Sequence, residues 1–112
     1  MNLYYQRNNN PDTNVRTEKQ ITTDGDSSRP AAYLSRSRVY AIFQRGTNLR
    51  KIYTEDIWSQ NPTWQGDAVA LTNASNPNVV YDEVANHAHL GYWYNSAIYY
   101  ARSDDGLTSF RN

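Results

Sequence analysis

The 112-residue chain contains no cysteine, which excludes a disulfide framework and thiolate chemistry. Its eleven basic and eleven acidic side chains cancel, so no net charge draws it to nucleic acid or to an anionic membrane. No apolar run approaches the roughly 20 residues that a membrane-spanning helix needs. The amino-terminal stretch MNLYYQRNNN lacks the layout of a signal peptide. We expect a soluble protein, cytoplasmic by default, although these features leave the compartment open.

Strong helix formers are also sparse, whereas Asn, Ser and Thr are abundant, and ten Tyr and three Trp stand against two Phe. Short runs rich in Tyr, Val and Ile alternate with turn clusters such as NNNPD, DGDSSRP and SDDG. No window has helical periodicity. The pattern predicts an all-β protein with strands at 3–7, 15–23, 31–35, 38–45, 50–56, 64–72, 78–83, 87–94 and 97–102.

Two segments resemble later ones at a constant offset. RPAAY (29–33) aligns with NPNVV (76–80), and KIYTED (51–56) aligns with IYYARS (98–103), both with a shift of 47 residues. A period of about 40 to 50 residues holding four short strands is expected of a β-propeller blade. The alternative is chance similarity among tyrosine-rich strands.

The repeat predicts one propeller-type module with four-stranded blades over residues 1–112. It divides into a partial blade (1–28), a complete blade (29–75) and a blade that lacks its last strand (76–112). About two blades cannot close a ring, and open sheet edges promote aggregation. We therefore expect a homo-oligomer, for example a trimer closing a six-bladed ring, unless the chain is a fragment.

The stretch SDDGLTSF (103–110) resembles the Asp-box of sialidase-like (BNR-repeat) propellers. The matching residues are Ser103, Asp105, Gly106, Thr108 and Phe110. The resemblance implies a structural turn after a blade's third strand, with side chains bonded to turn amides and an aromatic packed between sheets. It departs at Leu107, where a second glycine would stand, and at Phe110, where Trp is usual. By the 47-residue alignment, the turn at 56–64 keeps Trp64 and lacks the serine, aspartate and glycine.

Residues 37–64 also resemble, more weakly, a blade of the fucose-binding propeller lectins, in which an arginine, a glutamate and a tryptophan form the sugar pocket. The resemblance implies Arg38, Glu55 and Trp58 or Trp64 as sugar-binding residues; Tyr92 and Trp93 are further aromatic candidates in the next blade. That blade has no matching trio. The alternative is an exposed Arg–Glu pair beside a core tryptophan.

His87 and His89 fall on one face of a strand, as a metal pair would, but Asp82 or Glu83 is the sole candidate third ligand, so we predict no metal and no cofactor. Adjacent carboxylates such as Glu55 and Asp56 point to opposite faces of a strand and make a poor glycosidase pair. The sequence thus favours a non-catalytic, carbohydrate-binding module. The alternatives are a sialidase-like glycoside hydrolase, as a fragment or assembled from several chains, and a structural or protein-binding repeat.

Overall fold

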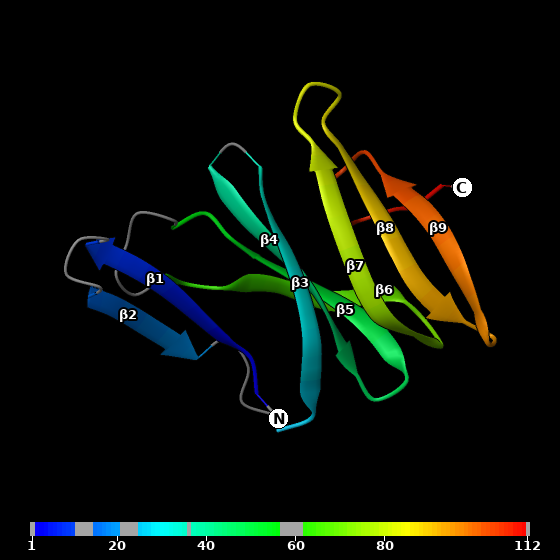
Figure 1. The fold of residues 1–112 in the computed structure, drawn as a ribbon, viewed down its shortest axis with the longest axis horizontal. Coiled ribbons are helices and arrows are strands. Elements are labelled where there is room, and N and C mark those ends of the chain that lie inside the picture. The colour runs from blue at the N-terminus through cyan, green and yellow to red at the C-terminus, as the bar shows by residue number, and fades with distance from the viewer. Residues whose placement is uncertain (1, 11–14, 21–24, 36, 57–61, 112) are drawn as a thin grey trace.

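The computed structural model describes residues 2–10, 15–20, 25–35, 37–56 and 62–111, and this part of the chain is all β (Figure 1). It contains no helix, and hence none long and apolar enough to cross a membrane. The strands are β1 (Tyr4–Asn10), β2 (Val15–Gln20), β3 (Ser27–Ser35), β4 (Arg38–Arg45), β5 (Asn48–Thr54), β6 (Gln65–Leu71), β7 (Ala74–Asp82), β8 (His87–Tyr94) and β9 (Ala97–Ser103). The predicted all-β class is confirmed, and residues 21–23 of the second predicted strand lie outside the described residues.

Every pair of neighbouring strands is antiparallel and consecutive in sequence. A four-stranded sheet has the order β3-β4-β5-β6, a three-stranded sheet has the order β7-β8-β9, and β1 and β2 form a hairpin. The two larger sheets lie side by side, and β3 of one faces β7 of the other (Figure 1). Seven strands therefore form two packed sheets.

Strands β3 and β7 each begin four residues earlier than predicted, because each contains a β-bulge. The register shifts between Ser28 and Ala31 in β3, and between Ser75 and Asn78 in β7. Pro30 and Pro77 lie within these bulges on edge strands, where a residue without an N–H is tolerated. Reading the two prolines as turn residues placed the strand starts too late.

The two bulges lie 47 residues apart, but the following strands are offset by 49. β8 and β9 begin 49 residues after β4 and β5, respectively. The difference arises because two residues (36–37) connect β3 to β4, whereas four (83–86) connect β7 to β8. The predicted shift of 47 therefore fits the first strand of each sheet and is two residues short for the third.

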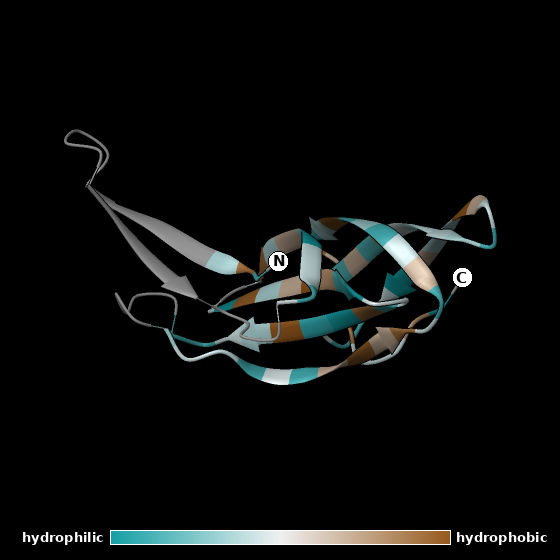
Figure 2. Ribbon diagram, turned by 90° about the horizontal axis from the view of Figure 1, so that it is seen from below, coloured by the Kyte–Doolittle hydropathy of each residue, from teal (hydrophilic) through white to brown (hydrophobic). Residues whose placement is uncertain are grey.

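The main core lies between the two larger sheets. Ile42 and Leu49 come from the four-stranded sheet, and Ala74, Ala88 and Leu90 come from the three-stranded one. A second cluster covers the opposite face of the four-stranded sheet and contains Leu3, Ala41, Phe43, Ile52 and the partly buried Trp64. Apolar and polar residues are interspersed along the strands (Figure 2). The adjacent Ile42 and Phe43 are both fully buried, so β4 is covered on both faces.

Gly66, at the start of β6, is required by both its backbone and its neighbour. Its φ is +74°, and a Cβ would lie 2.7 Å from Cε1 of Tyr53. We expect Gly66→Ala to lower the free energy of unfolding by about 2–3 kcal/mol, from strain and overpacking. Gly25→Ala is the matched control, since Gly25 has a φ of +75° with no atom within 4 Å of a built Cβ.

Urea unfolding of the two variants separates these two effects. Gly25→Ala should lose about 1 kcal/mol from backbone strain alone. Equal losses in the two variants would show that Tyr53 moves aside at no cost and would contradict the expected clash.

Candidate binding site between the two sheets

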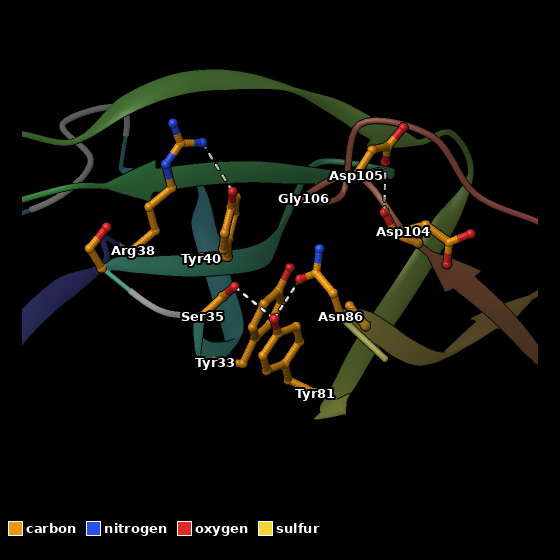
Figure 3. Close-up of a pocket in the computed structure, with 12 residues that line it drawn as sticks. Tyr33, Ser35, Arg38, Tyr40, Tyr81, Asn86, Asp104, Asp105 and Gly106 are labelled. Atoms are coloured by element: carbon orange, nitrogen blue, oxygen red, sulfur yellow. Dashed lines mark hydrogen bonds between the residues drawn. The ribbon is translucent and has the colours of Figure 1, made fainter. Parts of the chain in front are cut away.

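A cavity of about 250 Å³ opens at one end of the contact between the two larger sheets (Figure 3). Its walls combine tyrosine rings with polar groups, among them Ser35, Arg38, Asn86 and Asp104. The four-stranded sheet supplies Ser35 and Arg38, whereas the other sheet and its adjoining turns supply Asn86 and Asp104. The cavity therefore requires both sheets.

Four tyrosine rings form a row beside the cavity, and Tyr33, Tyr40 and Tyr81 of this row make its aromatic wall. Tyr33, Tyr40 and Tyr53 are cross-strand partners on β3, β4 and β5, which places their rings in a row on one face. Their ring centroids are 5.2 Å apart for Tyr33 and Tyr40 and 5.6 Å apart for Tyr40 and Tyr53. Tyr81 of β7 extends the row across the interface, 4.9 Å from Tyr33. Each contact of this kind contributes about 0.5–1.5 kcal/mol beyond its buried area.

Hydrogen bonds fix the hydroxyls at this wall. The Ser35 hydroxyl donates to Tyr81 Oη at 2.9 Å, and the Tyr81 hydroxyl donates to Asn86 Oδ1 at 2.5 Å (Figure 3). Burial, followed by the neighbouring Tyr40, Tyr81 and Asp105, raises the pKa of Tyr33 well above its ordinary value. Tyr33 is therefore neutral at any physiological pH.

Arg38 and Glu55 lie together beside the tyrosines. Arg38 Nη2 is 2.5 Å from Glu55 Oε1, and Arg38 Nη1 donates to Tyr40 Oη at 3.1 Å. The guanidinium carbon also lies 4.7 Å from the ring centroid of Tyr53. Both charged side chains are roughly half exposed, so their ion pair adds little to stability. Tyr40 and Tyr53 thus hold the guanidinium in place at the cavity wall.

The SDDGLTSF segment forms a turn closed by its own side chains. Asp105 Oδ1 accepts from the Ser103 hydroxyl at 2.9 Å and from the amides of Thr108 and Ser109 at 3.2 and 2.9 Å. The amide of Leu107 donates to Ser103 Oγ at 2.9 Å. Although partial burial raises the pKa of Asp105, the hydrogen bonds from Ser109, Ser103 and Thr108 outweigh it and lower this pKa to about 2.

This turn is also fixed to the opposite sheet. A Cβ at Gly106 would lie 2.7 Å from Tyr40 Oη, so the turn approaches that ring as only glycine permits. Lys51 Nζ donates to Thr108 Oγ1 at 2.9 Å. Leu107 is fully buried in the main core, and Phe110 packs against it. The turn therefore contributes both to the cavity wall and to the contact between the sheets.

A related pair of residues lies 49 positions earlier, an offset that the 47-residue alignment does not match. Thr54 and Asp56 occupy the positions of Ser103 and Asp105. Thr54 Oγ1 accepts from the Asp56 amide at 3.1 Å and donates to the Thr63 carbonyl at 2.7 Å. At this offset Asp56 stands in the position of the aspartate that the 47-residue alignment gave as lacking, and Thr54 supplies a hydroxyl in place of the serine.

Of the six candidate sugar-binding residues, Arg38 and Glu55 meet. Trp64 packs in the cluster around Phe43, on the other face of the four-stranded sheet. Tyr92 is half-buried at the edge of the main core, and Trp93 is exposed. Trp58 lies outside the described residues. Residue type alone did not identify Tyr33, Tyr81, Asn86 and Asp104 as cavity residues, although alternation along β3 and β4 would have aligned Tyr33 with Tyr40.

The two histidines have different partners. His87 Nε2 lies 3.3 Å from Asp104 Oδ1, whereas His89 Nδ1 lies 2.6 Å from Tyr100 Oη. Asp104 also pairs with Nε of Arg102 at 3.0 Å and Nε of Arg111 at 3.4 Å. Among the described residues no group of three or more His, Asp or Glu side chains is arranged to hold a metal. His87 and Asp104 are the 49-residue counterparts of Arg38 and Glu55, an equivalence that the shift of 47 concealed.

No protein-family model, no curated protein and no solved structure matches this chain. Its function is therefore inferred from the geometry of the cavity and of the two sheets.

Asp105 makes stability depend on pH. Its pKa is about 2 in the folded chain against an ordinary 3.8, so its contribution is complete above pH 4 and is lost as pH falls towards 2. At pH 6 we expect Asp105→Asn to lower the free energy of unfolding by about 1 kcal/mol, a modest value because the carboxylate is exposed to screening solvent.

Denaturant unfolding of both proteins at several pH values checks this expectation. The stabilities of the wild type and of Asp105→Asn should converge near pH 2, where Asp105 becomes neutral. A difference that stays constant from pH 6 to pH 2 would show that the charge of Asp105 does not hold the turn.

Proposed function

We propose that this chain is a non-catalytic carbohydrate-binding module of the β-propeller type, which holds a sugar in the cavity between its two larger sheets. The observation that carries the proposal is the placement of the Arg38–Glu55 pair beside the Tyr33–Tyr40–Tyr81 wall of that cavity. Charged donors and acceptors next to aromatic surface are the groups that recognise a ring with polar edges and apolar faces.

The size and polarity of the cavity suit one small polar ligand. Its volume of about 250 Å³ lies just below the roughly 300–1,000 Å³ typical of sites for drug-sized molecules. At the cavity wall Arg38 offers guanidinium N–H donors, Asp104 offers carboxylate acceptors, and Asn86 offers both kinds of group. Glu55 lies outside the wall and is paired with Arg38. Vicinal sugar hydroxyls, each both donor and acceptor, complement such a set.

The carboxylates near the cavity favour binding over hydrolysis. Glu55 is paired with Arg38, and Asp104 is surrounded by Arg102, Arg111 and His87. Asp105 accepts the bonds of its turn, and its pKa is lowered to about 2, whereas a glycosidase acid needs a raised pKa. Each carboxylate thus has a cationic or hydrogen-bond-donating partner, an arrangement that suits a hydrogen-bond acceptor.

Three observations support a propeller-type arrangement. Each larger sheet consists of consecutive antiparallel strands, and the two sheets pack face to face through β3 and β7. Their first strands carry bulges 47 residues apart, with Arg29 and Asn76 both at positive φ. β5 and β9 each end on a hydroxyl residue that is followed two positions later by an aspartate, Thr54 with Asp56 and Ser103 with Asp105. Stacked sheets of this kind are the building units of a propeller.

A glycan array followed by titration calorimetry tests the proposal. We expect binding to at least one sugar, and a 10- to 100-fold weaker affinity in Glu55→Gln and Arg38→Ala, because each loses charge-assisted hydrogen bonds worth about 1.5–3 kcal/mol. Arg50→Ala is the matched control. Arg50 Nε lies 2.8 Å from Asp67 Oδ1, and neither residue lines the cavity.

The control should bind as the wild type does. Absence of binding to every sugar on the array would leave the scaffold alternative. Release of the aglycone from an aryl glycoside, abolished by Glu55→Gln, would overturn the non-catalytic assignment.

A further inference from the structure

The outer face of the three-stranded sheet, turned away from the main core, carries large exposed apolar side chains beside polar ones such as His89 and Arg102. Side chains alternate along each strand, so Ala88, Leu90 and Ala101 point into the core while their neighbours point outwards. The outward set includes aliphatic and aromatic residues on all three strands: Val80, Trp93, Ile98 and Tyr100. Val80 is 65% exposed and Ile98 is 73% exposed. Large apolar side chains exposed on one sheet face indicate an interaction surface.

The contact between the two sheets identifies what fits this face. In that contact Tyr33 of β3 stacks on Tyr81 of β7. The 47-residue offset between these strands makes Val80 the counterpart of Tyr33 and Leu34 the counterpart of Tyr81. Both counterparts are apolar and exposed, since Leu34 is 58% exposed on the outer face of the four-stranded sheet. The outer faces of the two sheets therefore carry the counterparts of the two residues that meet in the internal contact.

The strands around Leu34 leave room for such a contact. Leu3 and Trp64 already cover Phe43 on this outer face, so the open part lies along β3 and its neighbour β4, where Leu34 pairs with Val39. β3 is an edge strand. Through the face that carries Tyr33, it makes a larger share of the contact with β7 than β4 or β5 does. Its exposed face can approach a further sheet without moving the residues that bury Phe43.

We propose that a second copy of this chain docks head to tail, with the outer face of its β3 and β4 on the outer face of β7–β9 and its Leu34 against Val80. The proposal specifies the partner and the faces for the expected self-association, and it is independent of sugar binding at the internal cavity. Because the two faces differ, a docked pair of chains leaves one face of each kind free, one at each end of the pair. Such contacts end in a closed ring or extend as a filament.

Light scattering after size exclusion, together with native mass spectrometry, tests the proposal on the complete chain. We expect a mass several times the 12.9 kDa of one chain. Val80→Lys and Leu34→Lys should each be monomeric, because each removes one of the two faces. Val84→Lys is the matched control, since Val84 is 95% exposed in the β7–β8 connection, outside the proposed contact, and this variant should assemble as the wild type does.

Mixing the two monomeric variants distinguishes head-to-tail docking from other arrangements. Each variant retains one intact face, so an equimolar mixture of Val80→Lys and Leu34→Lys should form a dimer of one chain of each. This dimer also demonstrates that both variants fold. Should Val80→Lys fail to fold, Val80→Thr replaces it and should assemble at least tenfold more weakly than the wild type.

A monomeric wild type would overturn the proposal, and so would a Leu34→Lys variant that assembles fully. The second result would mean that the β7–β9 face pairs with itself or with another surface. A monomeric wild type that still binds sugar would refute the docking while leaving the proposed function intact. An assembled wild type that binds no sugar would do the reverse.

Discussion

The stacking of Tyr33 between Tyr40 and Tyr81 is the interaction on which the rest of this structure depends. Tyr40 belongs to the same sheet as Tyr33, whereas Tyr81 comes from the other, so one ring fixes both the spacing and the alignment of the two sheets. The aliphatic core continues this contact on the same faces, around Ile42 and Leu90. Where the aromatic rings give way to polar side chains, the sheets enclose the cavity. The site is therefore a direct product of how the sheets pack.

The turn after β9 also holds the two sheets together, because it contacts β4 and β5 of the four-stranded sheet. Local hydrogen bonds to Asp105 define its shape, and its tip rests on Tyr40 through Gly106, with Lys51 bonded to Thr108. A purely local motif thus fixes a contact between residues more than fifty positions apart. The same contacts hold Gly106 and Tyr40 together in the wall of the cavity.

Much of the fold was predictable, because strand alternation and turn composition are local properties. β4 and β8 occupy the predicted ranges, and every other strand overlaps its prediction. The site was harder to predict. Trp64 matched by residue type, yet it packs on the face opposite Arg38, because chain order alone does not say which face of a sheet a residue occupies. Tyr33 and Tyr81 meet through the packing of two sheets, and the two extra residues between β7 and β8 concealed the counterparts of Arg38 and Glu55.

At Leu107 an unfavourable backbone conformation is combined with a fully buried side chain. Its φ of 67° is a left-handed conformation that costs a residue with a side chain about 1–2 kcal/mol, and glycine would adopt it freely. The same side chain is completely enclosed, and enclosing a leucine contributes about 1.5–3 kcal/mol. The two quantities nearly balance, with a small advantage to leucine. During divergence, this position can exchange leucine for glycine at little net cost whenever a neighbouring side chain grows to fill the space.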